Sequence, residues 1–227
     1  AGKYMLLDSA TRRNLELCET LREKQKRGSL LWVLDKTKTA MGARNLRKYI
    51  EQPLVQKYDI EKRLDALNEL LDNAISREEI REYLSPIYDL ERLITRVTYM
   101  SANPRDLIAF KNSIGMLPPI KTLLEDFDTE LLKELQTDMD PLEELYQLID
   151  ASIMEEPPIS VREGGLIKDG YNENVDKYRH AKTEGKTWLA ELEAKEREKT
   201  GIKNLKIKYN KVFGYYLEVT NSYKDLV

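Results

Sequence analysis

The chain has 227 residues, with 37 Lys or Arg against 40 Asp or Glu, so its formal charge at pH 7 is −3. Charged residues make up 34% and aromatic residues 8%, which favours an elongated helical protein over a compact sandwich or barrel. The single cysteine, Cys18, excludes an intramolecular disulfide, and a zinc site or a catalytic triad would depend on the single histidine, His180. Because His180 lies in a charged helical stretch, we expect it on the solvated surface. The sequence has no apolar run of 18 residues and no signal peptide at its start, so we expect an intracellular, cytoplasmic protein.

Amphipathic helices are predicted through the first 155 residues. Apolar residues recur at spacings of three and four in 64–71 and in 90–97, which places each set on one face of a helix. Ser76 followed by Glu79 predicts a capping box, and Asn103 directly before a proline predicts a helix start. Between these starts and the prolines that interrupt the pattern, we predict about eight helices.

A change of character follows in residues 155–170, where prolines and glycines surround a few apolar residues. This composition is typical of an extended crossing with tight turns, and we predict a hinge at Gly164, Gly165 and Gly170. Residues 172–199 then contain no proline and predict a helix that would span about 42 Å. Its apolar stripe is narrow, so we expect it to project from the body or to pair with one other helix; a surface helix lying flat on the core is the alternative.

The hydrophobic period changes from 3.6 to 2 after Gly201. Leu205, Ile207 and Tyr209 alternate with polar residues, and the alternation resumes in 215–219 after a turn. This pattern predicts a β-hairpin with one apolar and one polar face. A lone hairpin is marginally stable in water, so we expect further strands beyond the sequence given. The predicted fold is therefore mainly α, with a helical-bundle core, a long projecting helix and a small antiparallel β-hairpin.

The predicted hairpin is basic. Five lysines and no acidic residue fall between Lys199 and Leu217. Lysine ammonium groups on an exposed strand face suit the phosphates of a nucleic-acid backbone, and they do not read base edges as a planar group would. Lysines also decorate sheet edges to prevent aggregation, and charge alone does not separate the two interpretations. The candidate backbone-binding residues are Lys203, Lys206, Lys208, Asn210 and Lys211.

Other charged groups predict no chemistry of their own. The basic residues of two helical stretches are expected to be helix-surface charges or partners for nearby carboxylates, in preference to ligand contacts; they are Arg12, Arg13, Arg44, Arg47 and Lys48. The sequence contains no phosphate-binding G-x-x-x-x-G-K-[ST] loop and no carboxylate pair placed for acid–base catalysis. We therefore expect this segment to have no enzymatic activity.

Several motifs resemble one known family. The segments that carry the resemblance are 8–17 (DSATRRNLEL), 34–44 (LDKTKTAMGAR), 89–92 (DLER), 103–107 (NPRDL), 164–172 (GGLIKDGYN) and 200–220 (TGIKNLKIKYNKVFGYYLEVT). In this order they resemble the core, lever and clamp regions of the MutS family of DNA mismatch-recognition ATPases. The resemblance covers essentially the whole chain.

The resemblance implies a division of the chain into a helical core (1–156), an extended hinge (157–170), a long lever helix (171–200) and the start of a β clamp (201–227). It implies that the clamp holds double-stranded DNA by its backbone, and that motion of an ATPase part reaches the clamp through the lever. It places the ATP and magnesium site, the mismatch-reading wedge and the main dimer contact outside this segment, so that no cofactor is expected here. The implied partners are DNA, a second copy of the full-length protein and downstream repair proteins, in the cytoplasm at the bacterial nucleoid; no membrane contact is expected.

A second interpretation stays open from the residues alone. The long helix would bind a protein partner through the stripe formed by Trp188, Leu189 and Leu192, and the hairpin lysines would only prevent aggregation. The chain would then be a helical interaction scaffold that does not bind nucleic acid.

Overall fold

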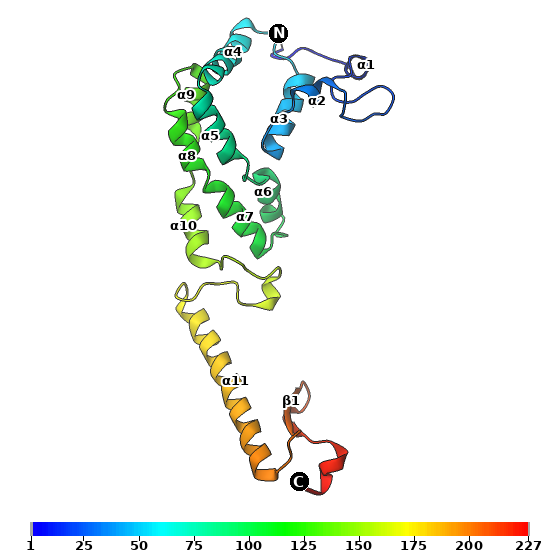
Figure 1. The fold of residues 1–227 in the computed structure, drawn as a ribbon, viewed down its shortest axis with the longest axis vertical. Coiled ribbons are helices and arrows are strands. Elements are labelled where there is room, and N and C mark those ends of the chain that lie inside the picture. Colours follow the sequence, from blue (N-terminus) through cyan, green and yellow to red (C-terminus); the bar gives the residue numbers. More distant parts are fainter. Residues whose placement is uncertain (1, 227) are drawn as a thin grey trace. The chain divides into compact units, whose positions relative to one another are not determined.

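The computed structural model describes residues 2–226 and divides the chain into two compact units, the first ending at Leu166 and the second beginning at Ile167. Figure 1 shows that both units are built mainly from helices, and the described residues contain one sheet, a two-stranded antiparallel hairpin. This confirms the predicted mainly α fold with a β-hairpin near its C-terminal end. The elements are α1 (Ser9–Asn14), α2 (Leu30–Leu34), α3 (Ala40–Glu51), α4 (Lys57–Asp72), α5 (Ala74–Leu84), α6 (Leu90–Thr98), α7 (Pro104–Ile114), α8 (Leu117–Leu124), α9 (Glu130–Asp138), α10 (Glu143–Ser152), the 3₁₀ turn η1 (Val161–Glu163), α11 (Glu173–Thr200), β1 (Lys206–Asn210), β2 (Gly214–Glu218) and the 3₁₀ segment η2 (Asn221–Leu226).

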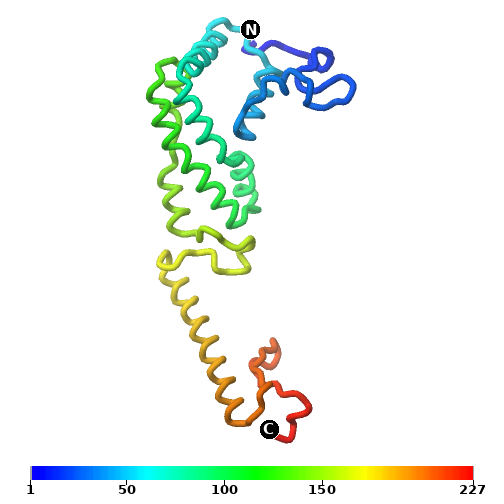
Figure 2. The backbone as a smooth tube through the Cα atoms, in the orientation of Figure 1, coloured from blue at the N-terminus to red at the C-terminus, as the bar shows by residue number. Residues whose placement is uncertain are grey.

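The core of the first unit lies among α4, α5, α8 and α9. These helices pack against one another in pairs, and the backbone trace in Figure 2 shows them side by side. Phe127, in the loop between α8 and α9, is a fully buried member of this cluster. The buried members of the cluster are Ala66, Ile87, Ile120, Leu124, Phe127 and Leu132.

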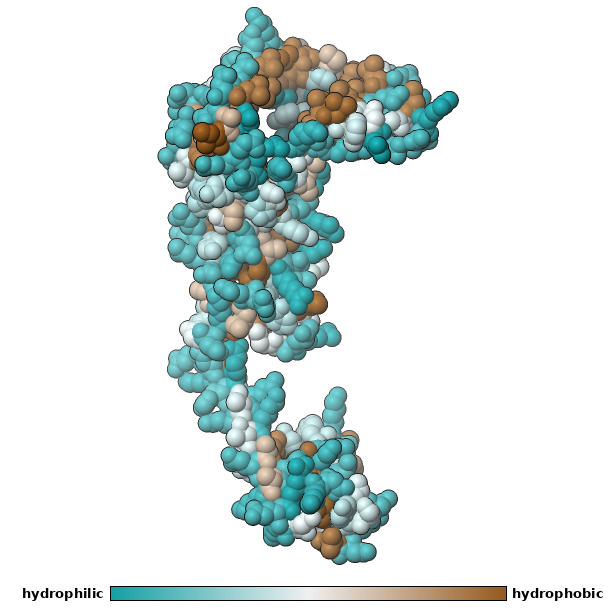
Figure 3. All heavy atoms as spheres, in the orientation of Figure 1, coloured by the Kyte–Doolittle hydropathy of each residue, from teal (hydrophilic) through white to brown (hydrophobic). Residues whose placement is uncertain are grey.

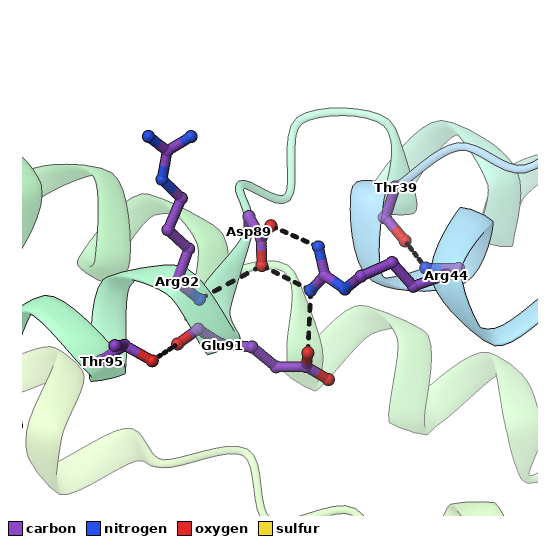
Figure 4. Close-up of polar contacts among 7 residues, drawn as sticks. Thr39, Arg44, Asp89, Glu91, Arg92 and Thr95 are labelled. Carbon is purple, nitrogen blue, oxygen red and sulfur yellow. Dashed lines mark hydrogen bonds and ion pairs between the residues drawn. The ribbon is translucent and has the colours of Figure 1, made fainter.

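An arginine joins α3 to α6 in the first unit. Arg44 donates two hydrogen bonds to Asp89, from Nη1 to Oδ2 at 2.6 Å and from Nη2 to Oδ1 at 2.9 Å, and a third from Nη2 to Glu91 at 2.8 Å. Asp89 also caps α6 by accepting from the backbone N–H of Arg92, so that one carboxylate serves both contacts (Figure 4). The predicted pairing of surface arginines with carboxylates is confirmed here, and again where Arg47 meets Glu51 at 3.1 Å.

Two sequence predictions on helices need correction. The described residues before position 155 hold ten α-helices and not about eight, because α1 and α2 have only six and five residues and are too short to show a helical period. Ser76 does not cap α5: the helix begins two residues earlier, and Asn73 accepts the hydrogen bond from the Ser76 N–H. The cap at Asn103 is confirmed, with Asp106 completing a capping box.

Helix α11 dominates the second unit and runs for 28 residues, as the sequence predicts. Asn172 caps its start, and Gly201 ends it with φ +72°, a left-handed conformation that glycine adopts without strain. None of its residues is buried. The helix therefore depends on its own backbone hydrogen bonds more than a helix such as α7 does, since α7 has five buried residues.

The surface of the described residues is mixed in polarity. Figure 3 shows apolar side chains gathered over the N-terminal helices of the first unit, and a mostly hydrophilic α11. Among residues 2–226, no helix has the length and apolar character needed to cross a bilayer.

Candidate nucleic-acid interface

The hairpin has the register that the alternation predicts. Lys206 lies opposite Glu218, Lys208 opposite Tyr216, and Asn210 opposite Gly214. Since successive side chains of a strand point to opposite faces, Lys206, Lys208 and Asn210 share one face with Glu218 and Tyr216.

The other face of the hairpin is apolar and turns toward α11. Ile207 pairs with Leu217, and the rings of Tyr209 and Tyr215 lie 5.0 Å apart. Together with the apolar stripe of α11, these strands line a groove of about 320 Å³. The groove is lined by Trp188, Leu189, Leu192, Glu196, Ile207, Tyr215, Tyr216 and Leu217. Tyr216, opposite Lys208, also reaches this groove, whereas Lys206 and Lys208 are exposed to solvent.

The four candidate lysines are all exposed, but they are not equivalent. Lys208 Nζ lies 2.8 Å from Glu218 Oε1, and this hydrogen bond raises the pKa of Lys208. Within the part of the chain that the structure describes, Lys203, Lys206 and Lys211 form no ion pair. Three of the candidate lysines are therefore available to bind a phosphate. Lys208 would first have to break its ion pair with Glu218. The alternation already places Glu218 on the lysine face, but the sequence alone does not show that it pairs with Lys208.

Asn210 shapes the turn of the hairpin. Its Oδ1 accepts the backbone N–H of Val212 at 2.8 Å and that of Phe213 at 3.3 Å, and Gly214 closes the turn with φ +80°. A phosphate would therefore meet the amide nitrogen of Asn210, which is the donor end of that side chain. The same turn presents Lys211 beside two exposed apolar residues, Val212 and Phe213.

The predicted hinge glycines differ in their surroundings. Gly164 and Gly165 have φ values of +72° and +71°, and an added Cβ would meet no atom within 4 Å at either position. Gly170 also has a positive φ, but its N–H donates to the carboxylate of Asp176 on α11 at 3.1 Å. The geometry thus favours Gly164 and Gly165 as points of rotation, and a hinge at these glycines stays a prediction.

Other candidate chemistry is limited in the described residues. His180 is exposed on α11, 3.0 Å from Glu184, which confirms its predicted surface position. No group of three or more His, Cys, Asp or Glu among residues 2–226 is arranged to hold a metal ion. Cys18 is half-buried, and burial, followed by the nearby Glu51 carboxylate, raises the pKa of its thiol.

These features define a helical domain that carries a basic β-hairpin against the end of a long exposed helix. Residues 10–221 match the family model for MutS domain III, and the chain belongs to the MutS family. It is 67% identical over 226 residues to the DNA mismatch repair protein MutS of Lachnoclostridium phytofermentans, a match that covers 100% of this chain and 24% of that relative. It is 57% identical over 225 residues to the MutS of Acetivibrio thermocellus, with 99% of this chain and 26% of the relative covered. The chain thus spans about a quarter of the length of these relatives, and the region it covers is domain III.

Proposed function

We propose that this chain is the core, lever and first clamp segment of a MutS-like mismatch repair ATPase, and that its hairpin grips the backbone of double-stranded DNA without reading sequence. The observation that carries the proposal is a set of three exposed lysines that form no ion pair within residues 2–226: Lys203 just before β1, Lys206 in β1 and Lys211 in the turn. Ammonium groups bind phosphate oxygens as point charges and release counterions from the duplex.

In this proposal the segment is not catalytic, and it divides into a core (1–156), a hinge (157–170), a lever (171–200) and the start of a clamp (201–227). The ATP and magnesium of the parent protein are assigned to its remaining three quarters, as are its dimer contact and its downstream repair partners. The working protein is a cytoplasmic homodimer on DNA at the bacterial nucleoid.

DNA binding is tested with the purified chain, by fluorescence anisotropy on matched and mismatched duplexes over a salt series. We expect similar, salt-sensitive affinities for both duplexes, because phosphates are common to them. Replacing Lys203, Lys206 and Lys211 together by Ala should weaken both complexes and reduce the salt slope by about 0.9 for each lost phosphate contact.

The matched control removes three exposed lysines from α11 instead, at positions 182, 186 and 195. An equal loss of binding in the control would show that total charge, and not the hairpin, drives association. Loss of mismatch binding alone in the hairpin variant would contradict backbone clamping.

The coupling role of α11 is tested separately in the full-length protein. A rigid helix converts a small rotation at its base into a larger displacement at its tip, and a proline in place of Ala190 would break the hydrogen-bond ladder. We expect Ala190→Pro to uncouple ATP-driven clamp movement, measured as a distance change between labels on the ATPase and the hairpin. Unchanged movement would contradict the lever.

A second candidate function is favoured by one observation. Trp188 is 61% exposed and contributes to the apolar groove beside the hairpin, which is the stripe expected of a helical protein-interaction scaffold. Self-association that depends on concentration and is lost in Trp188→Ala, with no DNA binding at low salt, would favour this function over backbone clamping.

A further inference from the structure

The hairpin is attached to α11 through two side chains that neither the resemblance nor the charge pattern singles out. Glu193 Oε2 accepts the backbone N–H of Ile207 in β1 at 2.9 Å. Arg197, one turn further along α11, donates from Nε to the backbone carbonyl of Leu205 at 2.7 Å, and its Nη2 lies 2.6 Å from Glu193 Oε1. Each side chain therefore binds both the hairpin backbone and the other side chain.

These contacts are partly shielded from solvent. The side chains of Glu193 and Arg197 are 25% and 37% exposed, whereas those of Lys177 and Glu173 on the same helix are 70% and 85% exposed. Ile202 and Leu205, which flank the same corner, are 0% and 2% exposed and supply the buried apolar contacts of the second unit. Figure 1 shows β1 lying alongside the C-terminal part of α11, where this corner forms.

The geometry differs from that of an ordinary surface ion pair. Adjacent turns of α11 bear many exposed charges, and such pairs contribute little because both partners are well solvated and mobile. Here each charged group also satisfies a backbone group of the incoming strand, and a charge-assisted hydrogen bond is shorter and stronger than a neutral one. Two fixed backbone anchors, at Leu205 and Ile207, determine both the position and the direction of β1.

We propose that Glu193 and Arg197 are positioning residues that lock the hairpin onto α11, so that the lysine face moves with the helix as one body. The functional consequence rests on the proposed DNA grip: without the lock, the lysines would keep their charge and lose their fixed orientation. Neither residue needs to touch DNA for this role.

The test uses the whole 227-residue chain with Cys18→Ser and spin labels at Lys186→Cys on α11 and Val212→Cys in the turn, both exposed positions. Arg197→Met removes the guanidinium and keeps an apolar stem. We expect it to broaden the distance distribution between the labels at least about twofold, and to speed amide exchange at Ile207 about tenfold. Lys195→Met, which removes an exposed cation from the same helix, is the matched control and should change neither quantity.

A milder variant keeps the proposal testable if Arg197→Met loses the hairpin altogether. Glu193→Gln retains an acceptor for the Ile207 amide and removes the ion pair, so it should give an intermediate broadening. Distance distributions and exchange rates that match the parent in both variants would overturn the lock.

DNA binding distinguishes a positioning role of Arg197 from a direct contact between Arg197 and DNA. If Arg197 only positions the hairpin, Arg197→Met should lower the affinity for duplex DNA several-fold and leave the salt dependence of that affinity unchanged. A salt slope reduced by about 0.9 would mean that Arg197 itself binds a phosphate, and this would overturn its positioning role. If the parent chain binds no DNA, the proposed function fails, while the distance and exchange measurements still decide the lock.

Discussion

Glu218 controls how much of the positive charge on the hairpin is available to a ligand. Its carboxylate holds the ammonium of Lys208 at 2.8 Å on the face that also bears Lys206. Because an anion competes with phosphate for the same ammonium group, this pair opposes backbone binding while it helps to hold the two strands together.

Removal of this carboxylate should therefore tighten DNA binding. We expect Glu218→Gln to raise the affinity for matched duplex and to steepen the salt slope by up to about 0.9, the contribution of one added phosphate contact. Anisotropy titrations over a salt series measure both effects. Glu198→Gln, which neutralises an exposed carboxylate of α11, is the control for net charge. A slope identical in both variants would exclude Lys208 from the interface.

The lowered pKa of Asp89 predicts that the stability of the first unit depends on pH. The hydrogen bonds from Arg44 lower the pKa of Asp89 from 3.8 to about 2; burial opposes this shift, and the Arg92 N–H adds to it. A lowered pKa means that the folded state stabilises the ionised form, so this contribution is complete above about pH 4 and is lost as the pH falls toward 2.

Urea unfolding followed by circular dichroism between pH 5 and pH 2 measures this effect. Asp89→Asn should lower stability at pH 5 and flatten the decline in acid, because the group that titrates is gone. Asp65→Asn, an exposed position on α4, should leave the decline as it is in the parent. Parallel declines in the parent and Asp89→Asn would contradict the assignment to Asp89.

Helix α11 contains a residue of low helix propensity near its centre. Gly185 lies within the helix, and an added Cβ there would meet no atom within 4 Å. Glycine loses more backbone entropy on helix formation than alanine does. Thr183 and Thr187, on either side, donate their hydroxyls to the carbonyls four residues earlier, at 3.0 Å and 3.1 Å, a contact that often accompanies bending.

We expect Gly185→Ala to stabilise α11 by about 0.5–1 kcal/mol, since only the backbone term changes. Amide exchange along the helix measures the gain. Ala190→Gly makes the reverse change at another exposed position and should cost a similar amount. A loss of stability in Gly185→Ala would mean that the helix needs its flexibility at this residue for a contact that the described residues do not make.

The sequence predicts elements whose signals are local and misses those whose partners are distant. Asn103 and its proline define the start of α7 within four residues, and the change of period after Gly201 defines the hairpin. The N-terminal end of α9 is different: its backbone N–H groups at Asp128 and Thr129 donate to Glu69, about 60 positions earlier on α4. The hydrogen bonds that join Glu193 and Arg197 to the hairpin were not predictable for a related reason. Charged residues recur throughout α11, and only the fold shows which of them contact the strand.

The two units differ in what stabilises them. The first has a continuous apolar cluster around Phe127, whereas the second has Ile202 and Leu205 as its buried apolar residues within the described chain. Burial of apolar side chains is the main source of folding free energy. We therefore expect the units to unfold in separate transitions, with the second unit melting over a broader range.

Phe127→Ala tests this separation. Truncation of a fully buried phenylalanine should destabilise the first unit by about 3–5 kcal/mol through lost burial and the cavity left behind. Exchange protection of β1 and β2 should stay at its parent value, because Phe127 belongs to the core cluster of the first unit and the hairpin lies in the second. Urea titration monitored by residue-resolved exchange follows both units at once, and a matching loss of protection in the hairpin would show that the chain unfolds as a single cooperative body.

The absence of buried side chains along α11 has a consequence for how its length can change. Each added residue advances the helix by about 1.5 Å and turns everything after it by about 100°. An insertion of seven residues falls only about 20° short of two full turns, so it would carry the hairpin about 10.5 Å further while nearly preserving the direction its lysines face. An insertion of two would turn that face by about 200°, to the opposite side of the helix. Because no side chain of α11 is buried, the length of the helix can vary by heptads while the hairpin keeps its direction about the helix axis.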